Sequence, residues 1–197
     1  PGKPLIMSTG MATAGELDEA CRAAREAGCE DLVLLKCTTS YPASPEDSHL
    51  LTIPHLRELF DVVVGVSDHS LGVGVSVAAV ALGACLIEKH FTIKRDGGVD
   101  SAFSMEFEEF RQLVDEVEKA WLALGQVHYG PSTGEVASLR GRRSLYVAKD
   151  IKTGETFTKE NVRSIRPGFG LPPKYLDVVL GKTAKQNLKK GAPLTWD

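Results

Sequence analysis

The sequence has few cysteines, and their arrangement does not mark a disulfide-rich or zinc-binding protein. Only four of the 197 residues are cysteines, and none forms a CxxC pair. Isolated cysteines in apolar surroundings usually behave as small hydrophobic residues. We therefore expect Cys21, Cys29, Cys37 and Cys85 to be reduced and buried.

Long apolar runs are also missing. No run approaches the roughly 18–20 residues that a membrane-spanning helix needs. The first residues, PGKPLIMSTG, lack the basic-then-hydrophobic order of a secretory signal. We expect a cytoplasmic protein with no membrane partner. The chain begins with Pro1 instead of methionine, which we interpret as the sign of a fragment.

Signatures of several common enzyme classes are absent as well. The chain has no Walker motif, no Gly-x-Ser-x-Gly elbow and no paired Cys/His nucleophile. The stretch GVGVSVA matches a dinucleotide-binding loop only in part, because the third glycine is missing. Nucleotide hydrolysis, serine-hydrolase chemistry and nicotinamide binding are therefore not expected.

The first part of the chain is poor in positive charge, and the last part is poor in negative charge. Residues 1–142 carry 12 Lys and Arg against 21 Asp and Glu, whereas residues 143–197 carry 11 against 5. Opposite signs indicate two domains that attract each other or bind an anion between them, although both surfaces could simply be solvated. The basic residues are interleaved with apolar positions, so no nucleic-acid partner is expected.

The chain does contain short apolar runs that alternate with amphipathic stretches, which is typical of βα units and a parallel sheet. Strands are predicted at 4–10, 31–37, 61–66 and 85–91, and helices at about 13–28, 50–60, 75–84 and 105–124. Strands that are apolar throughout are usually buried on both faces, as in doubly wound sheets and (β/α)8 barrels.

The pattern changes in the last part of the chain. The stretch 126–142, rich in glycine and small polar residues, is predicted to link a first domain at 1–125 to a second at 143–197. In the second domain, IKTGETFT from Ile151 and LKKGAPLT from Leu188 share one pattern. This internal repeat predicts a small, pseudo-symmetric, β-rich module.

Polar side chains follow two neighbouring predicted strands. Ser67-Asp68-His69 comes directly after one apolar run, and Glu88-Lys89-His90 after the next. The carboxyl ends of parallel strands meet at one edge of a sheet, where ligands bind. Two imidazoles there could bind one divalent cation whose coordination is completed by substrate oxygens and water. The alternative is that each histidine merely caps its strand.

The other charged groups at this edge allow several interpretations. Asp68 and Glu88 could orient the imidazoles or transfer protons, or they could form plain ion pairs with Lys89 or Lys36. An aldolase of similar architecture would use a Schiff-base lysine, and either lysine could serve. An alternative of another class is a non-catalytic module in which residues 143–197 recognise a sugar.

Several motifs together resemble those of the sialic acid synthase family. They are STGMA, LLKCTTSYP, GVSDHSLG, ALGACLIEKHFT, GGVDSAFS and the tail that runs from RRSLYVAKDIKTGETFT through NVRSIRPGFGLPPKYLDVVLGK. Within the family the chain is most similar to the pseudaminic acid synthase branch. The lysine of LLKC and the GGVDSAFS loop carry that distinction, and neuraminate or legionaminate synthesis remains an alternative.

The resemblance implies a fold and a reaction. Members of the family join a (β/α)8 TIM barrel to a small C-terminal SAF (antifreeze-like) domain, and they act as domain-swapped homodimers. They condense phosphoenolpyruvate with an N-acetylated amino sugar, with release of phosphate, and they need Mn²⁺ or Mg²⁺. For the pseudaminic branch, the sugar is a 2,4-diacetamido-2,4,6-trideoxy hexose.

The resemblance also implies roles for individual residues. His69 and His90 match the metal ligands, and Glu88 is the candidate for proton transfer beside them. The substrate-binding positions are Ser8, Thr39, Tyr41, Ser67, Asp100 and Arg166, of which Thr39 replaces an asparagine of the neuraminate branch and Arg166 reaches the barrel of the partner subunit.

The chain departs from the family in length. Only the last four βα units of a barrel are expected, followed by the SAF domain. A barrel of four strands cannot close, so two parallel-strand edges should be unpaired. We expect the 197-residue chain to be inactive by itself.

Overall fold

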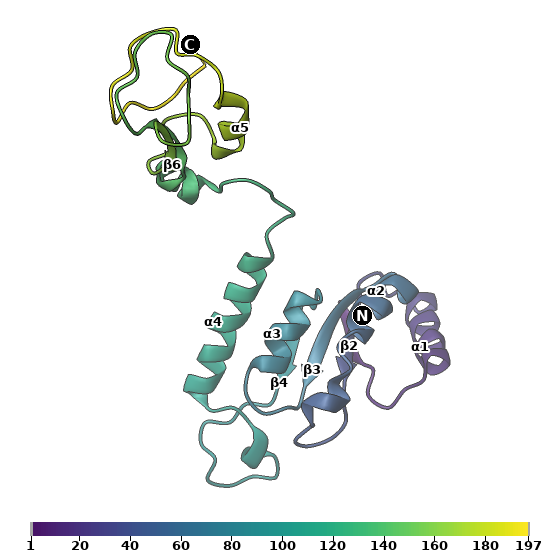
Figure 1. Ribbon diagram of the computed structural model, residues 1–197. Coiled ribbons are helices and arrows are strands. Elements are labelled where there is room, and N and C mark those ends of the chain that lie inside the picture. Colours follow the sequence, from purple (N-terminus) through teal and green to yellow (C-terminus); the bar gives the residue numbers. More distant parts are fainter. Residues whose placement is uncertain (1, 197) are drawn as a thin grey trace. The chain divides into compact units, whose positions relative to one another are not determined.

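The computed structural model describes residues 2–196, which form two compact units with their boundary in the chain after Gln126 (Figure 1). Within these residues, no helix combines the length and the apolar character needed to cross a membrane.

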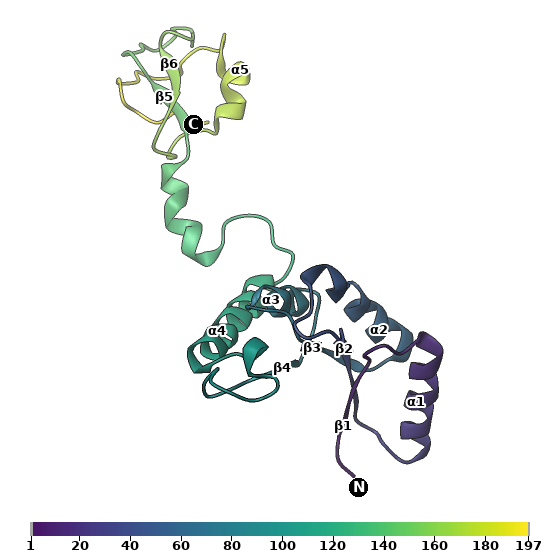
Figure 2. The same cartoon turned by 90° about the horizontal axis from the view of Figure 1, so that it is seen from below.

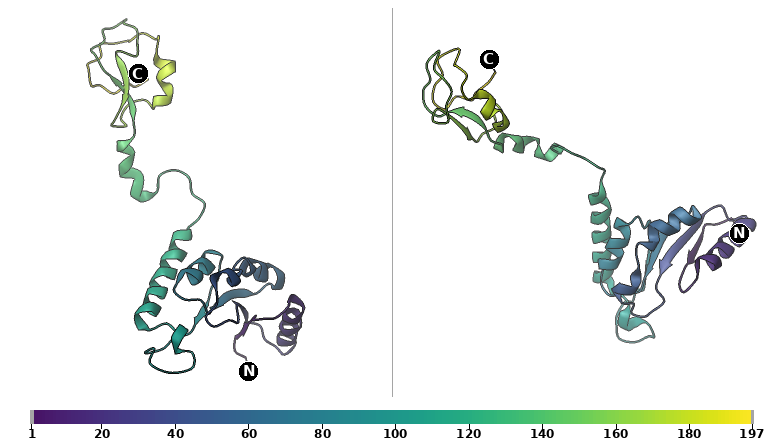
Figure 3. Two further views of the ribbon diagram at one scale, coloured as in Figure 1. Left: turned by 60° about the horizontal axis from the view of Figure 1, so that its bottom comes forward. Right: turned by 45° about the vertical axis from the view of Figure 1, so that its right-hand side comes forward.

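The first unit is an α/β half-barrel. Figure 3 shows the strands of this unit with helices beside them. The strands are parallel and lie in the order β1-β2-β3-β4. The four βα units expected from the sequence are therefore confirmed, and β1 and β4 are the two edges of the sheet. The strand bounds are Leu5–Ser8 for β1, Leu32–Cys37 for β2, Val63–Asp68 for β3 and Ile87–Lys89 for β4.

Local signals explain where the helices of this unit begin and end. A capping box starts α1: the Thr13 amide donates to the Glu16 carboxylate at 2.7 Å, and the Glu16 amide donates to the Thr13 hydroxyl at 3.3 Å. Gly125 ends α4 with a φ of 49°, which favours glycine. The helices are α1 (Ala14–Glu26), α2 (Thr52–Phe60), α3 (Gly74–Ala81) and α4 (Phe107–Leu124).

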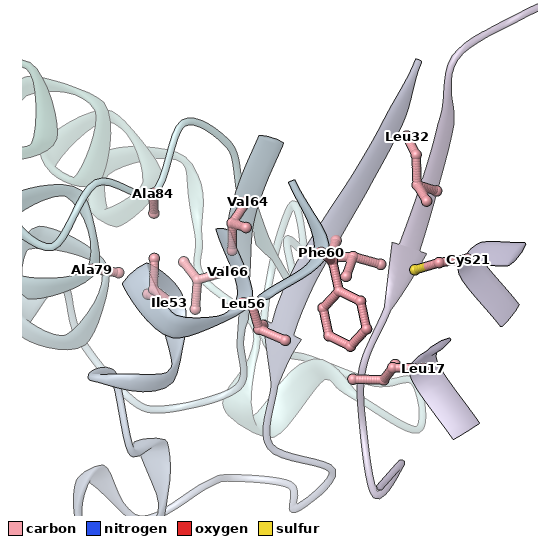
Figure 4. Packing of buried hydrophobic residues seen from close by; sticks show 11 residues of the cluster. Leu17, Cys21, Leu32, Ile53, Leu56, Phe60, Val64, Val66, Ala79 and Ala84 are labelled. Carbon is pink, nitrogen blue, oxygen red and sulfur yellow. The ribbon is translucent and has the colours of Figure 1, made fainter. Parts of the chain in front are cut away.

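The core lies between the helices and one face of the sheet. Val64 and Val66 of β3 point toward the helices, where Ile53 of α2 and Ala79 of α3 join the same buried cluster (Figure 4). Burial on both faces, however, is wrong for part of the sheet. Ile6 of β1 and Val63 of the inner strand β3 lie on the face opposite the helices, and each is 50% exposed.

The expectation that all four cysteines are buried is also wrong. All four are free thiols, but only Cys21 on α1 is buried. Cys29 and Cys37 are partly buried, and Cys85 is exposed. Cys85 lies just before β4, where it lines a hollow together with Val114 and Trp121 of α4.

The second unit contains a two-stranded antiparallel sheet, β5 (Ser144–Val147) with β6 (Val162–Ile165), and the short helix α5 (Leu176–Val179) (Figure 2). Its buried cluster includes Leu145, Val162 and Val179 and comes entirely from this unit. The stretch predicted as a linker contains a 3₁₀ helix at Thr133–Gly141.

The internal repeat has a structural basis. The first residues of the two copies, Ile151 and Leu188, pair with each other and exchange both backbone hydrogen bonds, at 2.9 and 2.8 Å. Three residues later, Gly154 and Gly191 occupy equivalent turns with φ values of 84° and 88°. Both turns need glycine, which adopts positive φ without steric cost.

Candidate functional site

The strand register places several of the predicted site residues on one face of the sheet. Ser67 lies beside Glu88, and Cys37 lies beside Ser67. Because alternate residues of a strand share a face, Ser8 of β1 points to this same side through its partner Leu35. This is the face opposite the helices. The residues two positions further along each strand, namely Thr39, His69 and His90, lie at its carboxyl edge.

His69 and His90 meet at that edge. Their ring centroids are 5.2 Å apart, and the ring planes are inclined by 71°. Imidazole nitrogens bind a transition metal at about 2.1 Å, which puts the centroids of two rings on one ion at roughly 5 Å. His69 is 8% exposed, and the side chain of His90 is 31% exposed. The spacing is therefore compatible with a shared cation that can be reached from solvent.

The loop after β2 determines which nitrogen of His69 is protonated. The Thr38 carbonyl oxygen lies 2.8 Å from His69 Nδ1. A carbonyl can only accept a hydrogen bond, so Nδ1 donates and Nε2 carries the lone pair of the neutral ring. The Ala43 amide donates to the His69 carbonyl at 2.9 Å, which holds the main chain as well.

Aromatic rings surround the two histidines. The ring centroid of Tyr41 lies 4.3 Å from that of His69 and 5.7 Å from that of His90. Phe103 completes the group, at 5.2 Å from His90 and 5.5 Å from Tyr41. Tyr41 is one of the predicted substrate-binding residues, whereas Phe103 was not predicted. The only signal for it was its position in the GGVDSAFS loop.

Asp100 comes from that same loop. Its Oδ2 lies 3.7 Å from His90 Nδ1, and its side chain is 55% exposed. The carboxylate is therefore close enough to orient His90 and open enough to accept a hydrogen bond from a hydroxyl or amide group of a ligand.

Ser67 and Glu88 form a pair on the open face of the sheet. The Ser67 hydroxyl donates to Glu88 Oε1 at 2.7 Å. Ser67 is buried at 4% exposure, whereas Glu88 is exposed. The pair brings together a group predicted to bind phosphoenolpyruvate and the group predicted to transfer a proton.

Asp68 points the opposite way and forms a buried ion pair with Lys89 at 2.8 Å. Ser70 and Ser76 also donate to its carboxylate, both at 2.6 Å. Burial alone would raise the pKa of Asp68, but these hydrogen bonds and the Lys89 charge outweigh it and hold the pKa below its usual range. Of the alternatives for Asp68, the ion pair with Lys89 is therefore the one that forms.

Lys36 is also buried, on the same side of the sheet as Asp68. Its ammonium donates to Thr38 Oγ1 at 2.7 Å. Burial lowers the pKa of Lys36. Neither Lys36 nor Lys89 is open to a substrate, because both are buried and already hydrogen-bonded, so the geometry gives no support to a Schiff-base aldolase.

The remaining predicted residues do not join the histidine cluster directly. Ser8 and Thr39 are exposed on the open face of the sheet, and Gly10 lies close enough to Thr39 that a Cβ there would approach its hydroxyl oxygen. Arg166 belongs to the second unit, where it is exposed immediately after β6.

The described residues offer few ligands for a metal. Across residues 2–196, no group of three or more His, Cys, Asp and Glu side chains is arranged to hold an ion. Two imidazoles alone bind weakly, so an ion here would need oxygen ligands from substrate or water. Such an open coordination shell is typical of a catalytic cation and not of a structural one.

Each of the two units matches a known protein family or domain. Residues 1–129 match the NeuB family, and residues 142–197 match the SAF domain.

Individual relatives agree with the family matches. The chain is 48% identical to the pseudaminic acid synthase of Campylobacter jejuni, over 98% of this chain and 56% of that protein. It is 38% identical to the N,N'-diacetyllegionaminic acid synthase of the same species, over 95% and 58%. A crystal structure of the spore coat polysaccharide biosynthesis protein SpsE from Bacillus subtilis matches with a TM-score of 0.60 and 31% identity, over 99% and 60%. The chain thus spans a little over half the length of these relatives.

Proposed function

The chain belongs to the NeuB family, and on that premise we propose that it forms the carboxyl-terminal part of a pseudaminic acid synthase-like enzyme. The reaction condenses phosphoenolpyruvate with a 2,4-diacetamido-2,4,6-trideoxy hexose to a nine-carbon nonulosonic acid. The observation that carries the proposal is the convergence of His69 and His90 beside the Ser67–Glu88 pair at one edge of the sheet.

The reaction needs a polarised sugar aldehyde. Carbon 3 of phosphoenolpyruvate bonds to the aldehyde carbon, water adds to carbon 2, and the C–O bond to phosphate breaks. A divalent cation, Mn²⁺ or Mg²⁺, would supply Lewis-acid polarisation of the aldehyde oxygen. His69 and His90 would hold it. The donor set fits this role, because His69 presents an Nε2 lone pair once Thr38 has bound Nδ1.

The other residues bind substrate and move protons. Glu88 accepts a hydrogen bond from Ser67, and its exposed carboxylate can take a proton from the attacking water. Ser8 and Ser67 offer hydroxyl groups to phosphoenolpyruvate, and Thr39 does so in place of an asparagine. Asp100 accepts from the sugar, and Tyr41 packs along the histidine rings.

Arg166 acts across a homodimer in this proposal. Its guanidinium would enter the barrel of the partner copy and bind the carboxylate or phosphate of the substrates. Its exposure after β6 supports a role in contacting another surface. In an active assembly, Arg166→Ala should raise the KM for substrate more than Arg163→Ala, the matched exposed arginine of β6.

A chimera tests the proposed activity. We expect the 197-residue chain alone to release no phosphate from phosphoenolpyruvate, because four strands do not close a barrel. Fusion to the portion of the Campylobacter jejuni synthase that lies outside the matched region should restore release with Mn²⁺ and the diacetamido sugar. If N-acetylmannosamine proves the better acceptor, the neuraminate alternative replaces the pseudaminate one.

Metal binding is measured separately on the same chimera. His69→Ala and His90→Ala should each weaken Mn²⁺ binding at least about 100-fold, since even outer-shell changes at metal sites cost about 10–100-fold. His55→Ala, an exposed histidine of α2, is the matched control. Phosphate release that survives both site substitutions would refute the metal role, and undiminished sugar binding without turnover would favour a non-catalytic module.

A further inference from the structure

Lys36 is a buried lysine whose partners are all neutral oxygen atoms. It is 8% exposed, and its Nζ donates to Thr38 Oγ1 at 2.7 Å, to the Cys37 carbonyl at 3.3 Å and to the Asp47 carbonyl at 3.5 Å. Within residues 2–196 it forms no salt bridge, while the nearby carboxylate of Asp68 pairs with Lys89. A buried charge without a counter-charge is destabilising, so its presence at this position needs a reason.

The surroundings of Lys36 leave no room for a substrate. The cavity beside it has a volume of ≈ 10 Å³ and is also lined by Ser67, Asp68 and His69. That volume is about the size of one water-sized sphere, and a three-carbon phosphorylated acid is several times larger. Lys36 must therefore act through the protein groups that it contacts.

Those contacts close the base of one loop, residues 38–48, which we call the clasp loop. The Lys36 ammonium reaches Thr38 at its start and Asp47 near its end. The Thr38 hydroxyl also donates to the Asp47 carbonyl at 3.0 Å, so a single ammonium and a single hydroxyl tie the two ends together.

The clasp loop in turn holds His69 at two points. The Thr38 carbonyl binds His69 Nδ1 at 2.8 Å, and the Ala43 amide binds the His69 carbonyl at 2.9 Å. Thr38 thus connects Lys36 to His69, because its hydroxyl is held by the Lys36 ammonium and its carbonyl holds the His69 imidazole.

From this geometry we infer that Lys36 is a positioning residue that acts through Thr38 to hold His69 in its Nδ1–H tautomer, with Nε2 presented as the acceptor. The inference rests on the proposed function only for what Nε2 then binds. Lys36 touches no substrate and forms no covalent bond; its ammonium keeps the carbonyl of Thr38 aimed at the ring.

Nitrogen chemical shifts of ¹⁵N-labelled histidine test this directly, because they separate the two neutral tautomers. In the full chain, His69 should give the Nδ1–H pattern. Two variants test the connection: Lys36→Met keeps the length of the side chain, and Thr38→Val removes the hydroxyl but keeps the main-chain carbonyl. Each should give a mixture of the Nδ1–H and Nε2–H tautomers at His69. Thr38→Ser should preserve the wild-type pattern, and His90 serves as the internal reference.

A single Nδ1–H tautomer in Lys36→Met or in Thr38→Val, with unchanged amide signals from β2 and β3, would overturn the inference. If Lys36→Met does not fold, Thr38→Val against Thr38→Ser decides the question, since both retain the lysine. A purely structural role for Lys36 would change amide signals throughout the sheet without a selective change at His69.

Mn²⁺ binding separates this inference from the proposed function. Weakening of about 10–100-fold in Lys36→Met is expected, as for other changes behind a metal ligand. If the wild-type protein binds no Mn²⁺ at all, the proposed metal role fails. The tautomer measurement still tests the positioning role of Lys36 independently.

Discussion

Asp68 and His69 are adjacent in the chain and serve different purposes, because successive residues of a strand point to opposite faces. Asp68 faces the helices, and its carboxylate accepts hydrogen bonds from Lys89, Ser70 and Ser76. His69 follows it toward the open face, where His90 lies. The buried Asp68 therefore stabilises the carboxyl end of β3, and His69 reaches the candidate functional site.

The Asp68–Lys89 pair gives a prediction for stability. Lys89→Met should lower the free energy of unfolding of the first unit by about 3–5 kcal/mol, because it leaves a buried carboxylate without its counter-charge. The amide signals of β2 and β3, followed through a urea titration, measure this. Lys119→Met breaks an exposed pair with Glu116 on α4 and should change little. Equal effects of the two substitutions would contradict the buried role.

Lys36 gives a prediction for pH dependence. Burial lowers its pKa in the folded state below the value of about 10.4 in the unfolded chain. Between those two pKa values the unfolded state binds more protons, so this group makes the free energy of unfolding rise with pH. Lys36→Met lacks the buried charge and should be at least as stable as the wild type near pH 7.

The measurement is the difference in unfolding free energy between wild type and Lys36→Met from about pH 7 to about pH 10. The advantage of the methionine variant should shrink as pH rises. A difference that stays constant over this range would show that Lys36 remains fully charged in the fold.

The approach of strand β4 to strand β3 depends on one glycine. A Cβ on Gly65 would lie 2.5 Å from the Leu86 carbonyl oxygen and 2.6 Å from Leu35 Cδ2. The first contact is with the main chain of Leu86, and the second is with the side chain of Leu35 on the neighbouring strand β2. Because both groups are held by the packing of the sheet, neither can move away independently. Gly65 thus permits the close strand pairing that brings the two histidines together.

Gly65→Ala should therefore lower the free energy of unfolding by about 1–3 kcal/mol through overpacking. It should also shift the imidazole signals of both His69 and His90. Gly74→Ala is the matched control, because nothing lies within 4 Å of a Cβ there. Unchanged histidine signals in Gly65→Ala would show that the site geometry does not depend on this contact.

Helix α4 shows how far a helical pattern can predict its environment. The apolar residues at three- and four-residue spacing predict the helix correctly, from Phe107 to Leu124. Yet Val114 and Trp121 on that face are 50% and 66% exposed. They line a hollow of ≈ 850 Å³ together with Leu86 and Ile87. Periodicity identifies an apolar face, but it cannot say whether a partner covers that face.

The part of the molecule that the structure describes, residues 2–196, has two separate cores. The cluster around Val64 and Ile53 comes only from the first unit, and the cluster around Leu145 and Val162 only from the second. Each sheet is likewise built from strands of one unit. Buried apolar area and backbone hydrogen bonds are the main stabilising contributions, and both are internal to the units.

The fragment 142–197 should therefore fold by itself. Its amide chemical shifts should match those of the same residues in the full chain, apart from the new amino terminus. A spectrum of an unfolded peptide would show that the second unit depends on the first. As a control, Leu145→Ala in the fragment should abolish the folded spectrum, because Leu145 is fully buried.

Much of the candidate site could be predicted because strand order and alternation are local properties. The apolar run before Ser67 and the run before Glu88 each predict a strand, and parallel strands bring their carboxyl ends together. Phe103 could not be predicted in this way. It reaches His90 through a loop whose path depends on contacts distant in sequence, such as the backbone bond from Met105 to the His90 carbonyl.

The amino-acid sequence by itself determined the order of strands and helices, the division into two units and the face on which Ser67, His69, Glu88 and His90 lie. Hydrophobic periodicity and capping residues act between close neighbours, so they can be read without a fold. Only the tertiary structure decided that Asp68 pairs with Lys89, that Lys36 closes the clasp loop and that the histidine rings stand 5.2 Å apart. Those contacts join segments far apart in the chain, and their distances depend on how strands and loops pack together.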